Sequence, residues 1–483
     1  MDKYPHGVLP EDGGIQTPDN VASFIDGLYT SFRGLTTGPF VVYGDVQTDC
    51  YHAVLGNGGK LNALYSGMLQ PQMEEFGTVW NGFYGAISSA NYIIENIERL
   101  QNSEDMDEED LAQLNGYMGT AQFFRAYCYY ELAQKFCKAY DKTSAELAHS
   151  GIPISLKYNP TSINTTYLSR NTLEEVYTQI LKDLEGAEKL LKEYGPRPDD
   201  GIWADAPYFT INAVNAMRAR VALSMKDYEK AFNLSKALIS SRNYTLSKSQ
   251  NDITAMWAKD TGREAIMRVH MTWQFLGFPT GEYFKAPLGT NAAFIPTNEA
   301  VRLYSNNDKR YSAYMTNEIL AIENTNITVV GMNKYPGNPV LYTSSNNFVN
   351  MSKPFHIAEQ YLIAAEAAAE LGDAASANDY LNMLRANRMD DYTNEYYSGQ
   401  ELINNIRVER QRELFGEGFR LGDLKRWGIG FTRSVAQNSS VVNQLGNIDR
   451  TSYEADDYRF VWPIPKGEMD ANPQLKGQQN PGY

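Results

Sequence analysis

Cysteine and histidine are scarce in this sequence of 483 residues, which contains three cysteines and five histidines. Cys50, Cys128 and Cys137 are an odd number without metal-ligand spacing, so no disulfide framework is expected. The histidines are scattered and cannot assemble a zinc motif. Neither a glycine-rich phosphate loop nor a nucleophile elbow is present. We therefore expect no cofactor and no metal, and no motif singles out a catalytic residue.

Positive charge is also in deficit, since 43 lysines and arginines face 58 aspartates and glutamates, for a net charge of −15. Such a surface repels phosphate backbones and anionic lipid heads, so we expect no nucleic-acid partner. No stretch approaches the roughly 20 consecutive apolar residues of a membrane helix. The first residues, Met1-Asp-Lys-Tyr-Pro, lack the apolar run of a signal peptide.

Aromatic residues, by contrast, are abundant, with 33 tyrosines, 20 phenylalanines and 6 tryptophans. Rings with a polar tip suit half-apolar ligands such as sugars, but they also fill helical cores. From composition alone the core interpretation is favoured. The length suggests roughly two to three domain-equivalents of an ordinary globular protein.

Several long segments have the apolar period of an α-helix. The clearest stripe consists of Phe76, Trp80, Phe83, Ile87, Ala90, Ile94 and Ile97. An acidic run at 104–110 precedes a second helix, from 111 to about 136. Acids at a helix start favour the positive end of its dipole, so we interpret the run as a solvated helix terminus. A calcium site is the alternative, but its loop pattern is missing.

Two helical hairpins share one design, with small residues where the helices cross and a short polar corner between them. The first covers 213–238 and turns at 225–230, and the second covers 361–384 and turns at 371–374. This is the logic of tetratricopeptide helix pairs. Their wide separation in the chain argues against a continuous solenoid.

Other parts of the chain lack a helical period. Loops rich in glycine, proline or aromatic residues are expected at 38–72, 195–208 and 272–297. Short strands are expected at 264–271, 327–330 and 340–343.

The C-terminal region has a distinctive order of elements. A helix is followed by a corner at Gly416 and Gly418 and by a short helix ending at Trp427. An extended segment at 462–468 and a closing 479–483 tail follow. Together these stretches resemble the C-terminal region of the SusD/RagB family. That family comprises cell-surface lipoproteins of Bacteroidetes that capture glycans, or in some members peptides, for a TonB-dependent transporter.

Further stretches resemble landmarks of the same family, in the expected order over nearly the whole chain. They are 80–84 with 90–93, 122–132 with 151–154, 294–304 with 307–311, and 358–366. The resemblance implies a mainly α fold, a SusD-like scaffold of dispersed tetratricopeptide-like helix pairs with long loop insertions and a few short β-strands.

The resemblance also implies a single SusD-like domain over residues 1–483. Its parts are an N-terminal helical and loop region at 1–200, helix pairs at 210–242 and 355–427, a ligand-loop insertion at 243–350, and a C-terminal tail at 428–483.

Most of these landmarks are best interpreted as structural. Trp80 lies on the apolar stripe of its helix, which favours the core. Glu409 and Glu413 could suggest paired catalytic carboxylates, but Arg410 between them continues an apolar stripe, and a charge drawn into a core must be paired. The two glutamates could pair with Arg410, and Glu366 on the second hairpin is a further candidate partner. A structural ion network is therefore expected.

The function that the resemblance implies is non-catalytic binding of oligosaccharide or polysaccharide at the cell surface. The glycan would be delivered to a SusC-like TonB-dependent transporter in the outer membrane. Members of the family normally begin with a signal peptide and a lipid-bearing cysteine. Because Leu9-Pro-Glu-Asp-Gly and the helix from Asn20 to Phe32 resemble the family's mature N-terminus, we expect a truncated mature lipoprotein.

Sugar binding of this kind needs aromatic faces beside polar groups that satisfy the hydroxyls. Three loops offer that combination. The candidate ligand-binding residues are Asp45 and Asp49 with Tyr65 and Gln72, Trp203 in the Pro/Gly loop, and Trp273 with Tyr283. Loop aromatics also anchor their own loops, so this packing role remains an alternative for each ring.

Three other classes of function stay open. A RagB-type protein would bind peptides. A glycoside hydrolase would need two carboxylates about 5 to 10 Å apart, which the sequence neither identifies nor excludes. A protein-interaction scaffold built on the helix pairs would bind no small ligand.

Overall fold

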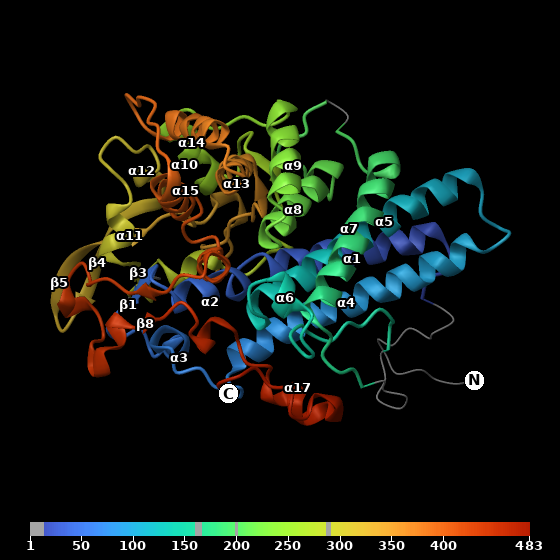
Figure 1. Cartoon of the computed structure of the whole chain (residues 1–483), viewed down its shortest axis with the longest axis horizontal. Helices are drawn as coiled ribbons and strands as arrows, with labels where there is room; N and C mark the ends of the chain where they lie inside the picture. Colours follow the sequence, from blue (N-terminus) through green and yellow to red (C-terminus); the bar gives the residue numbers. More distant parts are fainter. Residues whose placement is uncertain (1–13, 160–166, 199–200, 286–290) are drawn as a thin grey trace.

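The computed structural model describes residues 14–159, 167–198, 201–285 and 291–483. The N-terminal landmark at 9–13, and residues 199–200 of the second expected loop, lie outside these ranges. Helices dominate the described chain (Figure 1). The α-helices are α1 (Pro18–Leu35), α2 (Pro39–Gln47), α3 (Asn62–Ser66), α4 (Glu74–Gln101), α5 (Glu108–Phe136), α6 (Lys142–Ala145), α7 (Leu173–Tyr194), α8 (Ile211–Ser224), α9 (Tyr228–Ser240), α10 (Gln250–Ala258), α11 (Asn298–Arg302), α12 (Tyr311–Tyr314), α13 (Ile357–Glu370), α14 (Ala374–Arg388), α15 (Gly399–Glu413), α16 (Arg420–Trp427) and α17 (Lys466–Ala471).

Four long helices of the N-terminal half, α1, α4, α5 and α7, pack against one another. Each begins where its sequence supplies a cap or acids in the first turn. Thr17 and Thr172 form capping boxes at α1 and α7, and Asp107 accepts hydrogen bonds from the first turn of α5. The predicted stripe on α4 faces the core, and Trp80 is 2% exposed. The prediction that Trp80 is a core residue is confirmed.

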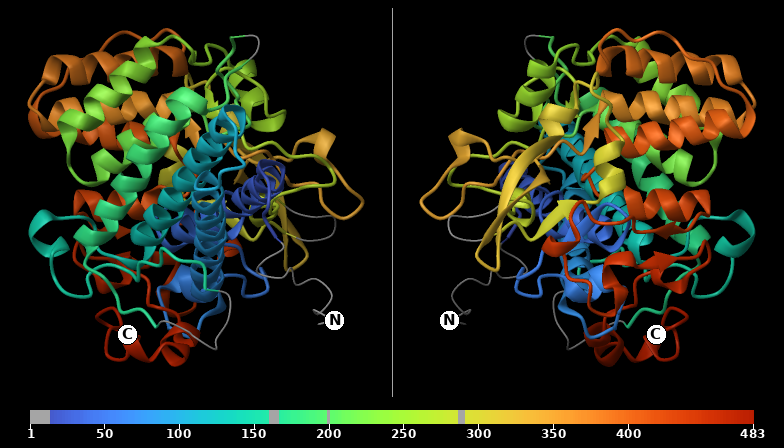
Figure 2. Two further views of the ribbon diagram at one scale, coloured as in Figure 1. Left: turned by 90° about the vertical axis from the view of Figure 1, so that its right-hand side faces the viewer. Right: turned by 90° about the vertical axis from the view of Figure 1, so that its left-hand side faces the viewer.

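Both predicted helical hairpins are present, as α8 with α9 and α13 with α14. Helix α13 also packs on α9, so the two pairs adjoin although far apart in the sequence. Gly372 turns the second corner at φ +80°, and Asp373 caps the following helix. In Figure 2 these green and orange helices gather at one end of the molecule, with the red C-terminal segment at the other.

Sheet structure in the described residues consists of two-stranded antiparallel pairs. The pairs are β1 (Tyr51–Ala53) with β3 (Phe294–Pro296), β2 (Ala265–Met267) with β6 (Phe355–His356), β4 (Met315–Ile322) with β5 (Thr325–Met332), and β7 (Phe431–Thr432) with β8 (Ser452–Tyr453). Of the strand predicted at 264–271, only the three residues of β2 are in a strand, whereas the strand predicted at 327–330 lies within β5. The strand predicted at 340–343 is wrong. A 3₁₀ turn starts there because Pro339 lacks an N–H and the Asn338 side chain accepts from Val340 N.

The prediction of a loop at 38–72 is also wrong, because this segment contains α2, β1 and α3. Helix α2 escaped detection because it is buried on nearly every side and therefore shows no amphipathic period. The corner at Gly416 and Gly418 is confirmed, with φ of +77° and +84°. A side chain at Gly418 would meet the backbone of Val41 in α2, with 2.8 Å between the added Cβ and the carbonyl oxygen.

A buried ion network holds the C-terminal helices together. Arg310 donates to Asp308, Glu409 and Glu413, and Arg388 donates to Glu413 from α14. Burial raises the pKa of Glu409, but the surrounding arginines outweigh it and hold the pKa at about 2. The predicted structural role of Glu409 and Glu413 is confirmed. The expected partners of Arg410 are wrong, however, because Arg410 pairs with Asp423 at 2.8 Å and Glu366 pairs with Arg426.

A second buried cation joins the C-terminal tail to the N-terminal region. Arg433 is 1% exposed, and its guanidinium lies 4.0 Å from the ring centroid of Tyr65. Its hydrogen bonds go to carbonyl oxygens, those of Val46, Gln47, Thr48, Tyr65 and Ile448. Because these oxygens lie at the C-terminal ends of α2 and α3 and in the tail, Arg433 fastens three segments at one point. We call this set the Arg433 cradle.

Candidate functional site

A group of exposed aromatic side chains lies on loops beside the C-terminal half of α1. Tyr208 is 53% exposed, Trp273 62%, Phe275 58% and Phe278 45%. Large aromatic rings exposed together mark an interaction site more often than a structural one. We call these four residues, with the α1 side chains beneath them, the α1 strip.

The middle of the α1 strip is formed by a tight turn. Thr272 and Phe275 exchange two backbone hydrogen bonds of 2.9 and 3.3 Å, so Trp273 stands at the tip of the turn. The Phe275 ring lies over α1, with the Arg33 guanidinium carbon 5.7 Å from its centroid. Arg33 also donates to the carbonyl of His270. The turn is therefore fixed to α1 from both sides of Trp273.

Phe278 continues the α1 strip toward α2. Its backbone N–H donates to Thr37 Oγ1 at 2.8 Å. Its side chain covers Gly38, where an added Cβ would lie 2.5 Å from the Cβ of Phe278. Gly38 also has φ of +53°, so both the backbone conformation and the close approach require glycine. The site thus depends on a residue without a side chain.

Tyr208 brings a second loop to the other end of the α1 strip. Its ring is 5.9 Å from that of Tyr29 on α1. The loop is aligned by a parallel bridge between Ala206 and Met267, the last residue of β2. The two expected loops around Trp203 and Trp273 therefore approach the same strand, although about seventy positions separate the tryptophans in the sequence. Trp203 itself is half-buried against the main core.

The candidates on the first predicted loop have structural partners. Asp45, in α2, is 1% exposed and accepts from the backbone N–H groups of Gly418 and Arg420. Burial raises the pKa of Asp45 to about 7. Asp49 forms a two-point ion pair with Arg420, and Tyr65 has no exposed surface. In this conformation these side chains hold the C-terminal corner and the Arg433 cradle, and Asp45 and Tyr65 offer no face to a ligand.

Two further candidates differ in exposure. Tyr283 is 7% exposed, with the Lys60 ammonium 4.3 Å from its ring centroid. Gln72 is exposed in the turn before α4. Of the seven candidate residues, Trp273 alone is an exposed aromatic ring of the α1 strip. The proposal of ligand contact therefore rests mainly on Trp273.

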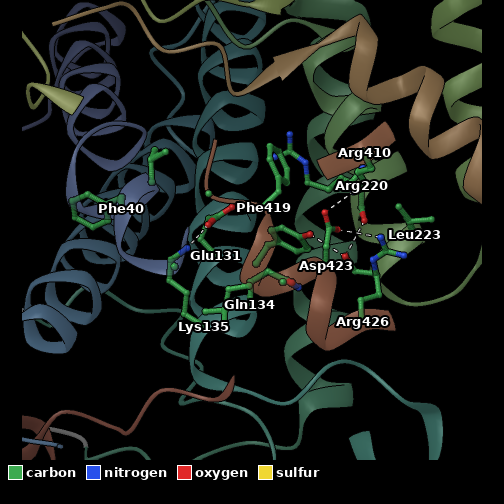
Figure 3. Close-up of a pocket in the computed structure, with 17 residues that line it drawn as sticks. Phe40, Glu131, Gln134, Lys135, Arg220, Leu223, Arg410, Phe419, Asp423 and Arg426 are labelled. Carbon is green, nitrogen blue, oxygen red and sulfur yellow. Dashed lines mark hydrogen bonds and ion pairs between the residues drawn. The ribbon is translucent and has the colours of Figure 1, made fainter. Parts of the chain in front are cut away.

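A small cavity of about 60 Å³ lies between α2, α5, α8, α15 and α16 (Figure 3). Its walls are charged, yet the charges satisfy one another. Asp423 pairs with Arg410 and Arg426, and Glu131 pairs with Lys135. Ligand pockets usually measure about 300–1,000 Å³ and a water occupies about 30 Å³, so this cavity suits a few waters rather than a sugar.

A group of three buried side chains has the composition of a metal site. Atoms of Glu264, His356 and Glu413 lie within 4.8 Å of one another. However, Arg388 donates to Glu264 at 2.7 Å and to Glu413 at 2.8 Å, so a guanidinium already neutralises both carboxylates. His356 Nε2 lies 3.0 Å from Glu417. We interpret this group as part of the ion network.

Arg33 and Tyr208 belong to the α1 strip and were missed from the sequence. Arg33 follows the buried Phe32 near the end of an amphipathic helix, where a basic residue is usual. Tyr208 follows a proline at the end of the loop expected at 195–208, so a signal for it was available in the same loop as Trp203. A signal was available for Phe275 and Phe278, which share the Gly/Pro-rich loop with Trp273.

Comparisons with known proteins identify relatives along the whole chain. Residues 239–483 match the family described as the SusD family, and residues 2–223 match a family described as starch-binding associating with outer membrane. A SusD-like protein of Formosa agariphila is 23% identical over 469 residues, covering 87% of this chain and 82% of the relative.

Solved structures share the fold. A SusD superfamily protein from Bacteroides thetaiotaomicron superposes with a TM-score of 0.80 at 26% identity, covering 96% of this chain and 100% of that chain. A laminarin-binding SusD-like protein superposes with a TM-score of 0.72 at 19% identity, covering 97% of this chain and 100% of that one. The mainly α architecture predicted from the sequence is confirmed.

Proposed function

The chain belongs to the SusD family, and we propose that it is a non-catalytic protein that binds oligosaccharide or polysaccharide on the α1 strip. The observation that carries this proposal is the set of four exposed rings, Tyr208, Trp273, Phe275 and Phe278, on loops held against α1. Both the family and the laminarin-binding relative support a glycan as the ligand.

The chemistry of the α1 strip suits sugars. Aromatic faces pack against the C–H side of a sugar ring, and polar groups at their edges satisfy the hydroxyls. Arg33 and the exposed side chains of His270 and Gln274 supply such groups beside Phe275 and Trp273. Because the turn is already held on α1, little ordering is needed when a ligand arrives.

We further propose that the bound glycan is delivered to a SusC-like TonB-dependent transporter at the outer membrane, where an N-terminal lipid would hold the protein. The match of residues 2–223 to a family described as associating with the outer membrane supports this location. Among the described residues, no helix combines the length and apolar character needed to cross a bilayer.

The test is affinity electrophoresis or calorimetry against plant, host and microbial polysaccharides, comparing the wild type with Trp273→Ala. An indole ring buries about 200 Å², so covering one face contributes about 2.5 kcal/mol, and its loss weakens binding by tens of fold. Tyr396→Ala is the matched control, because Tyr396 is 70% exposed in the loop between α14 and α15. Equal affinity of Trp273→Ala and wild type for the bound glycan would overturn the assignment of the site.

The other classes of function give different results in the same experiment. New reducing ends during incubation with a glycan would show hydrolysis and contradict non-catalytic binding. If no glycan retards the protein and mixed peptides raise its melting temperature, the RagB-type alternative of peptide binding is favoured.

A further inference from the structure

Arg33, which lies in the α1 strip, differs from two cations outside it, Arg268 and Lys60, in how its charge is balanced. Arg268 lies 3.6 Å from Asp205, and Lys60 lies 3.7 Å from Glu282. Arg33 has no carboxylate within 4.0 Å among the residues that the structure describes. This is unexpected in a chain where 58 acids outnumber 43 lysines and arginines. Among the residues that the structure describes, the positive charge of Arg33 is therefore left without a carboxylate partner.

Arg33 is also only partly used in hydrogen bonding. Nη1 donates to the carbonyl of His270 at 3.3 Å, and Nη2 donates to Thr30 Oγ1 at 2.7 Å. Both acceptors are uncharged. A guanidinium has five N–H groups, so most of its donor capacity remains for a ligand. Partial burial lowers the pKa of Arg33, opposed by Asp26 two helical turns away. The guanidinium has therefore lost part of its hydration without forming an ion pair.

The guanidinium of Arg33 lies next to the exposed aromatic rings of the α1 strip. It lies over one side of the Phe275 ring, with exposed Trp273 two residues away. Because the guanidinium covers one side of Phe275, a sugar stacked on the neighbouring Trp273 would bring the substituents at its edge beside Arg33. The planar fork of a guanidinium matches the two oxygens of a carboxylate or sulfate group.

We propose that the glycan bound by the α1 strip carries an anionic group, a carboxylate or a sulfate ester, and that Arg33 receives it. This inference rests on the glycan binding proposed above. The net charge of −15 opposes a polyanion at long range. At physiological ionic strength, however, exposed charges beyond about 8 Å are largely screened, so the local cation decides which ligand is accepted.

The experiment compares one anionic polysaccharide that the wild type retains with its own neutral derivative. A uronate polymer is tested beside its carboxyl-reduced form, and a sulfated polymer beside its desulfated form, so that the two sources of charge are distinguished. We expect the wild type to bind the anionic member at least tenfold more tightly than the neutral one. We expect Arg33→Gln to abolish this preference, so that its affinities for the anionic and the neutral member become equal.

Two other variants complete the design. Arg33→Lys keeps the charge without the fork and should retain part of the preference. Lys182→Gln removes an equal charge from an exposed position on α7, which packs on α5, and should bind as the wild type does.

Each outcome bears on one proposal. If the wild type prefers neutral glycans and Trp273→Ala weakens their binding, the proposed function stands and the anionic ligand is excluded. If Arg33→Gln keeps the full preference, Arg33 is not the receptor of the charge. If neither member of any pair is retained, glycan binding itself fails and the inference fails with it.

Discussion

The Arg433 cradle can be tested by replacing its cation with methionine. Arg433→Met places an unbranched apolar side chain beside Tyr65 but removes every N–H group that donates to the five carbonyl oxygens. A buried polar group left without a partner costs about 1–3 kcal/mol. Five unpaired carbonyl groups would set a high upper bound on the loss of stability. Water that enters the space left by the guanidinium reduces this loss, because it can donate to some of the oxygens.

We therefore expect Arg433→Met to lower the free energy of unfolding by about 3–5 kcal/mol, out of a total of about 5–15 kcal/mol. Arg433→Lys, which keeps the charge but only three N–H donors, should cost about 2 kcal/mol. Arg450→Met, at an exposed position in the same tail, should change stability by less than about 0.5 kcal/mol.

Urea unfolding followed by tryptophan fluorescence measures these differences. Limited proteolysis adds a local measurement, because a loosened cradle should expose the tail after residue 433 to cleavage before the rest of the chain. An unfolding free energy of Arg433→Met within 1 kcal/mol of that of Arg450→Met would refute the reasoning. Tyr65 and its neighbours would then be candidates for ligand binding again, because their contacts with Arg433 would contribute little to stability.

Two predictions concern the buried ion network. Glu413→Gln removes the charge shared by Arg310 and Arg388 and should cost about 3–5 kcal/mol in urea unfolding, whereas the exposed Glu401→Gln on the same helix should cost less than about 0.5 kcal/mol; equal effects would contradict the network. Burial lowers the pKa of His356, but Glu417 outweighs it and raises the pKa above its ordinary value. The stability that this proton contributes is complete below about pH 6.5 and is lost as pH rises through the folded-state pKa. The difference in unfolding free energy between wild type and His356→Gln should therefore be largest at about pH 6 and shrink by about pH 9, and a difference that grows with pH would exclude this role.

The parts of the fold that could be predicted were those whose sequence pattern is local. The stripe on α4, the two helical hairpins and the glycine corner at 416–418 each follow from a period or a turn residue. Helix α2 could not be predicted in this way. It is buried on nearly all sides, and one of the helices that cover it, α16, comes from the far end of the chain.

The candidate site shows the same division. Trp273 was predicted because an aromatic residue among glycines and prolines indicates an exposed turn, and the structure places it at the tip of one. Asp45 and Tyr65 were chosen for the same residue types, but their partners Gly418 and Arg433 are more than 360 positions away. Residue type alone does not distinguish a ring that meets a ligand from one that supports a distant arginine.

The Arg433 cradle also constrains when the protein can complete its fold during synthesis. Thr48 and Arg433 are separated by 385 positions. At translation rates of about 5–20 residues per second, α2 waits roughly 20–80 seconds for the side chain that binds its terminal carbonyls. Until then, the N-terminal half is an unfinished intermediate that depends on the last fifty residues. A chain interrupted before position 433 would therefore lack a component of its N-terminal core as well as its C-terminal tail.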